Sequence, residues 1–223
     1  MTPRAGCLVV VFAKSPAPGQ VKTRLIPALG AQGAAEMHRR MVRHTLSTAV
    51  TAFPAQVELW VTPDRTDPFF QACAAEFSVA LEGQTPGGLG EKMNHAMEAG
   101  LTRARTVLLI GTDCPMLSAS YLHASCAALV AGNDVVLGPA EDGGYALIGA
   151  RSACRQIFTG ISWSTRTVLA ETRLRLAEAG LRWQEMPLLW DVDVADDLTR
   201  VATNARLRHL VEDVAQRRAE DAA

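Results

Sequence analysis

The stretch that decides the fold is Thr106-Val-Leu-Leu-Ile-Gly-Thr-Asp-Cys-Pro115. Its apolar, β-branched run ends abruptly at Gly111, and polar segments flank it on both sides. A continuous apolar run of this length is typical of a buried parallel strand. Open α/β sheets bind ligands at the carboxyl ends of their strands, so we predict that Asp113 faces a binding site. A helix cap or an Asx turn before Pro115 would explain the same aspartate.

The composition is that of an ordinary globular protein, with 223 residues, 48% hydrophobic, 20% charged and a net charge of −1. We expect a single domain over residues 1–223, with its core at about 7–200 and a C-terminal helix and frayed tail over 201–223. The balanced charge argues against a nucleic-acid partner. No apolar run approaches the roughly 18 residues of a membrane span, and the first one lacks a signal-peptide layout. We therefore expect a cytoplasmic protein; the oligomeric state is left open.

The cysteines are odd in number and form no C-x-x-C pair, so we expect reduced thiols rather than disulfides or a zinc site. Cys114 stands beside Asp113, but no histidine lies close to it in sequence. A nucleophilic thiolate needs such an activating partner, which argues against a nucleophilic role for Cys114.

Segments with strand and helix patterns alternate along the chain. Strands are predicted over residues 7–13, 56–62, 77–81, 106–110, 133–139, 145–149 and 188–193. Helices are predicted over residues 31–52, 69–76, 91–99, 117–131 and 167–179, and from residue 196 onward. This alternation indicates an α/β fold with a mostly parallel sheet.

The first strand leads into a shaped, basic loop, Lys14-Ser-Pro-Ala-Pro-Gly-Gln-Val-Lys-Thr-Arg-Leu25. Its two prolines and Gly19 exclude a helix or a strand. Lys14, Lys22 and Arg24 then suit a phosphate group, lysine as a point charge and arginine as a two-pronged donor. The spacing of a Walker loop is absent. A solvated basic turn is the alternative interpretation.

The most glycine-rich loop runs from Glu82 to Gly90. Glycines such as Gly90 allow the backbone to approach a ligand closely, and the helix that follows offers free N–H groups. Gln84 could read a nucleobase. A plain connecting loop would explain the same residues.

Two further segments carry polar residues at predicted strand ends. The turn Glu141-Asp-Gly-Gly144 needs only one Asp-Gly pair as a hairpin, which leaves Glu141 and Asp142 unexplained. Asp191 and Asp193 end the strand predicted over 188–193, and period-two spacing would point both to the same side. Such acids could help coordinate Mg²⁺.

The segment Ile161-Ser-Trp-Ser-Thr-Arg166 precedes a predicted helix. Ser164 and Thr165 are good N-cap residues. Trp163 is either a hydrophobic staple or a surface on which a sugar or a base could stack.

Together, Phe12-Ala-Lys-Ser-Pro-Ala-Pro-Gly19, Val21-Lys-Thr-Arg-Leu25, Leu109-Ile-Gly-Thr-Asp-Cys-Pro115 and Gly138-Pro-Ala-Glu-Asp-Gly-Gly-Tyr145 resemble a family of GT-A-type transferases. Some of its members are named arsenosugar-biosynthesis glycosyltransferases or radical-SAM/selenodomain-associated transferases. The segments at Ile161 and Asp191 extend the resemblance, which covers roughly residues 8–198. It implies the fold of nucleotide-diphospho-sugar transferases, a Rossmann-like three-layer α/β/α arrangement around a mostly parallel mixed sheet.

The resemblance also implies roles for single residues. Asp113 matches the acid that binds a metal ion bridging the nucleotide phosphates, and Asp193, with Asp191 behind it, matches a late metal-binding acid. The usual D-x-D motif appears here only as Thr112-Asp113-Cys114, so a second carboxylate has to come from elsewhere. The residues Lys14, Lys22 and Arg24 match the phosphate-binding first loop. Mg²⁺ or Mn²⁺ is the expected cofactor.

The leading hypothesis is a metal-dependent glycosyl transfer from a nucleotide-sugar donor to a small-molecule acceptor. Asp142 would act as general base, if the sugar carbon is inverted. The acceptor side would be lined by Gly143, Tyr145, Trp163, Ser164 and Thr165.

Two alternatives stay open. The first is nucleotidyl transfer from an NTP to a phosphorylated acceptor, as in phospholactate guanylyltransferases, which share the first-loop element but carry a different turn at residues 141–145. The second is a non-catalytic nucleotide-binding protein that kept the fold.

Overall fold

The computed structural model describes residues 5–212 and residue 214. The predicted alternation of strands and helices is confirmed. Of the C-terminal helix and frayed tail predicted over 201–223, residues 213 and 215–223 lie outside the described residues. The elements are, in chain order, β1 (Ala5–Lys14), η1 (Thr23–Leu25), α1 (Ile26–Ala52), β2 (Val57–Thr62), α2 (Pro68–Phe77), β3 (Ala80–Gly83), α3 (Leu89–Leu101), β4 (Ala104–Ile110), α4 (Ala119–Val130), β5 (Val135–Pro139), β6 (Tyr145–Ala150), η2 (Arg155–Phe158), α5 (Val168–Glu178), β7 (Trp183–Glu185), α6 (Ala195–Thr203) and η3 (Arg208–Leu210).

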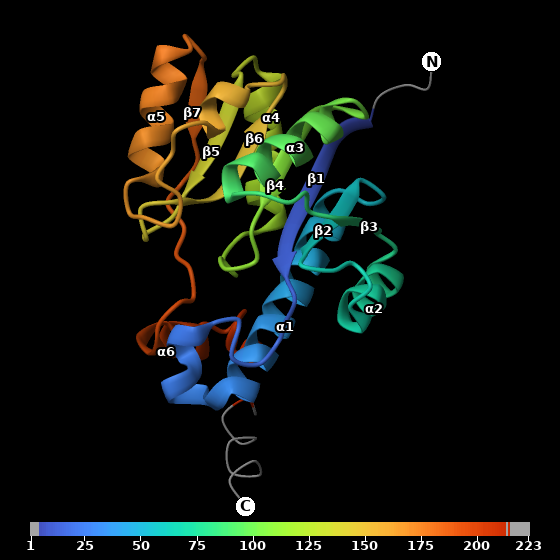
Figure 1. Cartoon of the computed structure of the whole chain (residues 1–223), viewed down its shortest axis with the longest axis vertical. Helices are drawn as coiled ribbons and strands as arrows, with labels where there is room; N and C mark the ends of the chain where they lie inside the picture. The colour runs from blue at the N-terminus through green and yellow to red at the C-terminus, as the bar shows by residue number, and fades with distance from the viewer. Residues whose placement is uncertain (1–4, 213, 215–223) are drawn as a thin grey trace, which may run out of the picture.

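The strands of the described chain form one sheet in the order β3-β2-β1-β4-β6-β5-β7 (Figure 1). Only β6 runs antiparallel to its neighbours, so the predicted mostly parallel, mixed sheet is confirmed. In the central pair, Val10 of β1 lies opposite Leu109 of β4. Because these two strands are parallel, the first loop and the segment after Ile110 leave the sheet at the same edge, where a site is expected.

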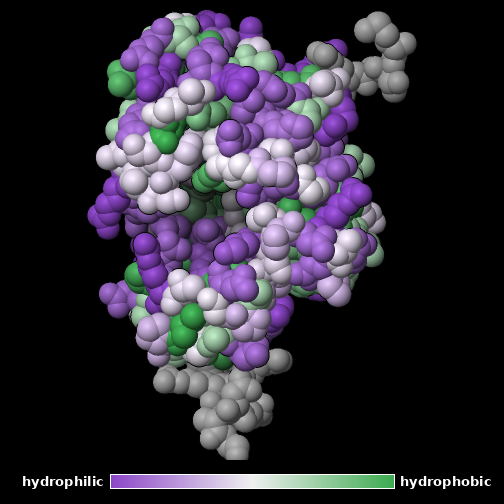
Figure 2. Space-filling view, in the orientation of Figure 1, coloured by the Kyte–Doolittle hydropathy of each residue, from purple (hydrophilic) through white to green (hydrophobic). Residues whose placement is uncertain are grey.

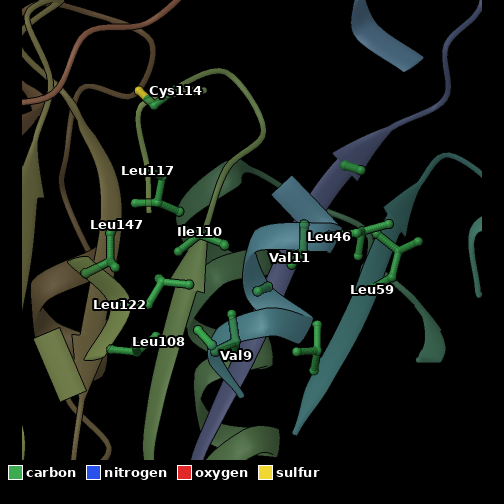
Figure 3. Packing of buried hydrophobic residues seen from close by; sticks show 14 of the residues in the cluster. Val9, Val11, Leu46, Leu59, Leu108, Ile110, Cys114, Leu117, Leu122 and Leu147 are labelled. Carbon is green, nitrogen blue, oxygen red and sulfur yellow. The ribbon is translucent and has the colours of Figure 1, made fainter. Parts of the chain in front are cut away.

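Helices cover both faces of the sheet, which gives three α/β/α layers. On one face α1, α2 and α4 pack against alternate strand residues; Figure 3 shows Leu46 of α1 near Val9 and Val11 of β1. On the other face α3, η2 and α5 pack against the remaining residues, among them Val10. The run Val9-Val10-Val11 is fully buried because both faces of β1 are covered, which is why the strand is continuously apolar.

A third cluster lies below the sheet, where α6 and the first part of α1 meet (Figure 1). Leu25 and Met37 pack there against Val192 and Val201. The helix α1 is kinked at Gly30, whose φ of 71° favours glycine. This small lobe holds the first loop against the C-terminal segment, so residues far apart in sequence reach the same edge of the sheet.

The strand predicted over residues 188–193 is wrong. Only Leu189 makes an isolated bridge, to Ala140, and the last strand is the earlier β7, parallel to β5. The backbone of this segment bonds instead to the ends of two different strands, since Leu189 N donates to Pro139 O and Val192 N donates to Asp113 O. A segment that crosses from one strand end to another cannot keep the regular pairing of a strand.

Candidate active site

Lys22 and two aspartates form the centre of the site, at the carboxyl ends of β1 and β4. Lys22 Nζ lies 2.6 Å from Asp113 Oδ1 and 3.1 Å from Asp193 Oδ1. It also donates to the carbonyl oxygen of Val192 at 2.7 Å. These three acceptors use all three protons of the ammonium group. The Lys22 side chain is 5% exposed, against 55% for Asp113 and 38% for Asp193, so the lysine lies beneath two carboxylates that face outward.

The electrostatics of the Lys22–Asp113 pair favour the charged forms of both groups. Burial alone would lower the pKa of Lys22, but attraction to Asp113 and Asp193 outweighs it and raises that pKa. Burial would raise the pKa of Asp113, and the charge and hydrogen bond of Lys22 overcome this and lower it. The Asp113 carboxylate is therefore kept charged at neutral pH.

Asp193 is fixed from both sides. Arg24 Nη1 lies 3.6 Å from Asp193 Oδ2, on a side chain that is 73% exposed. The backbone N–H groups of Asp193 and Val194 both donate to Asp197 Oδ2 at 2.8 Å, where Asp197 caps the start of α6. The cap places Asp193 at the end of a helix that packs in the small lobe.

A second pair of acids, Asp142 and Asp191, lies beside the first without a matching cation. Burial, followed by the charges of Asp142 and Asp193, raises the pKa of Asp191 to about 6. Within the described residues, Asp191 forms no ion pair. Asp142 Oδ1 accepts the N–H of Gly144 at 2.8 Å in the turn between β5 and β6. From their spacing, Asp191 and Asp193 are expected to point to the same side of a strand. Because their segment is not a strand, the two side chains lie in different environments.

A cavity of about 740 Å³ opens beside these acids. Asp113, Asp142 and Asp193 line it, and Figure 2 shows the hollow on this face of the molecule. The residues predicted for the acceptor side also line it, except Gly143; they are Tyr145, Trp163, Ser164 and Thr165. The structure therefore brings the predicted base and most of the predicted acceptor residues to one cavity.

Two of these acceptor-side residues hold the wall of the cavity in shape. Tyr145 and Trp163 meet edge to face, with ring centroids 6.4 Å apart. Neither Ser164 nor Thr165 caps α5, because Thr167 occupies the N-cap position. Both residues line the cavity wall instead.

Gly143 packs the acidic turn closely against the start of α5. Its φ is 89°, and a Cβ there would lie 2.2 Å from the carbonyl oxygen of Arg166. Its own carbonyl accepts the N–H of Leu169 at 2.9 Å. Only glycine fits this close approach, so Gly143 joins the acidic turn to the start of α5.

The first loop forms a smaller pocket of about 260 Å³ next to the same acids. Lys14, Lys22 and Arg24 line it. Lys14 Nζ donates to the carbonyl oxygen of Gln20 at 2.9 Å, across a turn in which Gly19 has a φ of 78°. Lys14 and Arg24 have side-chain donors left for a ligand, whereas Lys22 is occupied by its three acceptors.

A third pocket, of about 280 Å³, lies between the first loop and α3. Gln84 lines it and donates its Nε2 to the carbonyl of Trp60 at 3.0 Å, which leaves its Oε1 for a ligand. Gly90 lies elsewhere, in α3, where a Cβ would come within 2.6 Å of Phe158 O and Trp163 Nε1. Gly90 therefore permits close packing around Trp163.

The comparisons with known proteins agree with this architecture. Residues 45–165 match the family model described as "Uncharacterized protein conserved in bacteria (DUF2064)". A crystal structure from Desulfovibrio desulfuricans G20, described provisionally as a nucleotide-diphospho-sugar transferase, is 30% identical over 98% of this chain and 96% of that one, with a TM-score of 0.83. The chain belongs to the DUF2064 family.

More distant solved structures share the fold alone. Glucosyl-3-phosphoglycerate synthase from Mycobacterium tuberculosis is 12% identical over 95% of this chain and 80% of that chain, with a TM-score of 0.51. A CMP:2-keto-3-deoxy-manno-octonic acid synthetase is 14% identical over 88% of this chain and 97% of that chain, with a TM-score of 0.53. No curated protein matches the sequence significantly. The expected nucleotide-diphospho-sugar transferase fold is confirmed.

The DUF2064 match covers only part of the site. It includes Asp113, Asp142 and Trp163, whereas Lys22 and Asp193 come from segments outside residues 45–165. The ion pairs of Lys22 with Asp113 and Asp193 therefore link the matched region to segments that precede and follow it.

Sequence patterns missed His38 as a residue of the site. It is buried on α1, and one ring nitrogen, Nε2, lies 2.8 Å from the carbonyl of Lys14. Burial lowers the pKa of His38, so the neutral ring donates this hydrogen bond and supports the first loop. Its neighbours at helical spacing, Ala35, Met41 and Val42, are apolar as for any packing histidine, so no local signal could have distinguished it.

Cys114 is buried, and burial raises the pKa of its thiol. This agrees with the expectation that Cys114 is no nucleophile. In the part of the chain that the structure describes, no helix is both long and apolar enough to cross a membrane.

Proposed function

We propose that this protein is a metal-dependent transferase that moves a glycosyl group from a nucleotide-sugar donor to a small-molecule acceptor. The observation that carries the proposal is the pair of carboxylates, Asp113 and Asp193, held on Lys22 with their outer faces toward a cavity of about 740 Å³. Family membership supports it through the provisional description of the Desulfovibrio relative.

The donor set fits a hard divalent cation. No group of three or more acidic, histidine or cysteine side chains in the described residues is arranged to hold a metal ion. Mg²⁺, however, needs only one or two carboxylates when phosphates and water complete its shell. Asp113 and Asp193 would supply these; beside them, burial and then the negative charges of Asp142 and Asp193 raise the pKa of Asp191. Bound Mg²⁺ or Mn²⁺ would supply charge stabilisation for the leaving diphosphate. Solved structures of the mycobacterial synthase contain Mn²⁺ or Mg²⁺ with UDP.

The chain's own cations would bind the phosphates. Arg24 and Lys14 have donors available on the first loop. Lys22 can reach a phosphate only by giving up one of its three acceptors, so its resting role is to hold the two carboxylates in place. Gln84 would contact the base through its free amide oxygen.

Asp142 would take the proton of the acceptor. It lines the same cavity as Asp113, and its Oδ1 is held by Gly144 N, which orients the carboxylate. Trp163, Ser164 and Thr165 would position the acceptor, while Gly143 and Tyr145 keep the turn and the wall in place. A base held within reach of one hydroxyl is what inverting transfer requires.

Nucleotidyl transfer is the second candidate, because the pocket lined by Lys14, Lys22 and Arg24 adjoins the two acids and could hold a triphosphate. The released product separates the two reactions. Glycosyl transfer releases a nucleoside diphosphate, whereas nucleotidyl transfer releases pyrophosphate.

Calorimetric titration of UDP- and GDP-sugars, with and without Mn²⁺, tests the proposal. The metal should raise the affinity of the wild-type protein for one donor at least tenfold, and Asp113→Asn should lose this gain. Asp196→Asn is the matched control, since Asp196 is an exposed acid in the first turn of α6. Metal-dependent affinity retained by Asp113→Asn would refute the metal site. Stabilisation by an NTP alone, with pyrophosphate released, would favour nucleotidyl transfer.

A further inference from the structure

The cavity of about 740 Å³ is lined by two chemically different sets of side chains. Asp113, Asp142, Asp193 and Arg24 form the charged set. The apolar set, called the floor below, consists of Phe12, Leu89, Met93, Leu109, Ile148 and Val168. Figure 2 shows hydrophobic surface inside the hollow and hydrophilic residues around much of its rim.

The apolar floor is built by several elements at once. Leu109 and Ile148 are register partners on β4 and β6, and Phe12 extends the same sheet face from β1. Met93 comes from α3, and Val168 begins α5. Three neighbouring strands and two helices thus converge on one apolar surface, which a loop rearrangement alone would not remove.

Leu89 extends this floor to the mouth of the cavity. It is 42% exposed at the start of α3, although its side chain is large and apolar. A single exposed leucine is ordinary on a protein surface. Here it continues a lining already formed by Met93 of the same helix, so the exposed leucine and the cavity floor make one surface.

The floor offers few hydrogen bonds to a ligand. The six floor side chains carry no N–H or O–H group, and the polar groups of Tyr145, Trp163, Ser164 and Arg166 line the cavity beside them. The hydroxyl of Thr165 is already used, as it donates to Ser162 O at 2.7 Å. A polyhydroxylated acceptor lying there would lose hydrogen bonds to water without replacing them, which is costly. An apolar group would instead gain from leaving water.

We infer that the acceptor is amphiphilic: its apolar body, aromatic or aliphatic, lies on this floor while its hydroxyl group reaches Asp142. The inference rests on the proposed glycosyl transfer and narrows its acceptor class. In that reaction the hydroxyl oxygen bonds to the anomeric carbon, the bond from that carbon to the diphosphate breaks, and the hydroxyl proton passes to Asp142. The diphosphate leaves with the electron pair of the broken bond.

Binding of simple alcohols tests this inference without donor or metal. In protein labelled with ¹³C at the methionine methyl groups, the Met93 signal reports on the floor, and the exposed Met116 serves as an internal reference. Titration with 1-butanol, 1-pentanol, 1-hexanol and 2-phenylethanol should shift Met93. Affinity should rise about three- to fourfold for each added methylene group. Glycerol and glucose at the same concentrations should leave Met93 in place. Tighter binding of glycerol or glucose than of 1-hexanol would overturn the inference.

Two leucine variants control the assignment to the cavity. Leu89→Ser should weaken 1-hexanol binding at least about threefold, because it replaces an apolar contact with a hydroxyl group. Leu174→Ser should leave binding unchanged, since Leu174 is 56% exposed on α5 and does not line the cavity. Equal affinities of Leu89→Ser and wild type for 1-hexanol would contradict the assigned floor.

The outcome separates this inference from the proposed function. If 1-hexanol shifts Met93 but no nucleotide sugar binds, the transferase proposal fails and the apolar preference of the cavity stands. If a nucleotide sugar binds with metal and 1-hexanol does not shift Met93, the acceptor class is wrong and the transferase proposal stands. With the donor present, transfer to 1-hexanol should exceed transfer to glycerol at equal concentration.

Discussion

The two pairs of acids at the site carry the same functional group in opposite circumstances. Asp113 and Asp193 share the buried ammonium of Lys22, and the pKa of Asp113 is lowered in spite of burial. Asp191 lies beside Asp142 without such a cation, and its pKa rises to about 6. A carboxylate kept charged suits metal binding, which is the role proposed for Asp113. At Asp113 the charge of Lys22 outweighs burial, whereas at Asp191 burial is the largest cause of the raised pKa.

Removing the charge of Asp113 should have the largest effect, and the quantity affected is the rate of transfer. Asp113→Asn keeps the shape of the side chain but removes the carboxylate that would face the metal. We expect transfer to fall at least about 100-fold, as when one electrostatic contact to a developing charge is lost. Steady-state rates at saturating metal test this, and Asp196→Asn should retain the wild-type rate. An Asp113→Asn rate within threefold of wild type would show that Asp113 does not face the reacting phosphates.

Removing the shared cation should destabilise the first pair of acids. Lys22→Met leaves Asp113 and Asp193 without their common partner, although both are partly exposed and can be solvated. We expect the free energy of unfolding to fall by about 2 kcal/mol, less than for a fully buried pair. Urea denaturation monitored by tryptophan fluorescence measures it.

The control for this variant is Lys14→Met in the same loop, because Lys14 donates only to the Gln20 carbonyl on the surface. Its unfolding midpoint should stay close to that of the wild type. Equal losses of stability in the two lysine variants would show that the ion pairs of Lys22 with Asp113 and Asp193 add nothing to the free energy of unfolding.

Asp113 and Asp191 should also affect stability differently as the pH changes in the presence of a chelator. The folded pKa of Asp113 lies below 3.8, so its ionisation stabilises the fold above about pH 4 and this is lost only as pH falls through that folded pKa. The folded pKa of Asp191, about 6, lies above 3.8, so its ionisation costs stability that grows between about pH 4 and 6 and is complete above 6.

Asp191→Asn should therefore be more stable than wild type by about 1 kcal/mol at pH 7.5, allowing for partial exposure, and equal to it at pH 4. Asp113→Asn should be less stable by about 1 kcal/mol at both pH values, since half of that side chain is in water. Urea denaturation between pH 4 and 7.5 gives both curves. Parallel curves of stability against pH for the two variants would show that Asp113 and Asp191 do not differ in this way.

The smallest effect is expected at Glu141, next to Asp142 in the turn. Glu141 forms two hydrogen bonds with Arg200, at 2.8 and 3.1 Å, on the surface. Exposed ion pairs add little to stability, so Glu141→Gln should shift the melting temperature by no more than about 2 °C. Metal-dependent nucleotide binding should not change. A loss of that binding would show that Glu141 takes part in metal-dependent nucleotide binding.

Local patterns predicted the parts of the site that depend on local sequence. Asp113 could be placed because an apolar strand ends just before it, and the acidic hairpin around Asp142 follows from its Asp-Gly pair. The partnership of Lys22 with Asp193 could not be predicted, because it depends on a segment that crosses between strand ends. The apolar floor was also missed, since Phe12, Met93 and Leu109 look like ordinary core residues in the sequence.

The trio of Lys22, Asp113 and Asp193 has a consequence for the order in which the site is made. Lys22 bonds to a carbonyl 170 residues further along the chain, at Val192. At a synthesis rate of about 5–20 residues per second, that partner leaves the ribosome roughly 10 to 30 s after Lys22. The nascent chain can complete the sheet that carries Asp113 during this interval, while its lysine still lacks two of its three acceptors. The candidate active site is thus assembled last, after the scaffold that supports it.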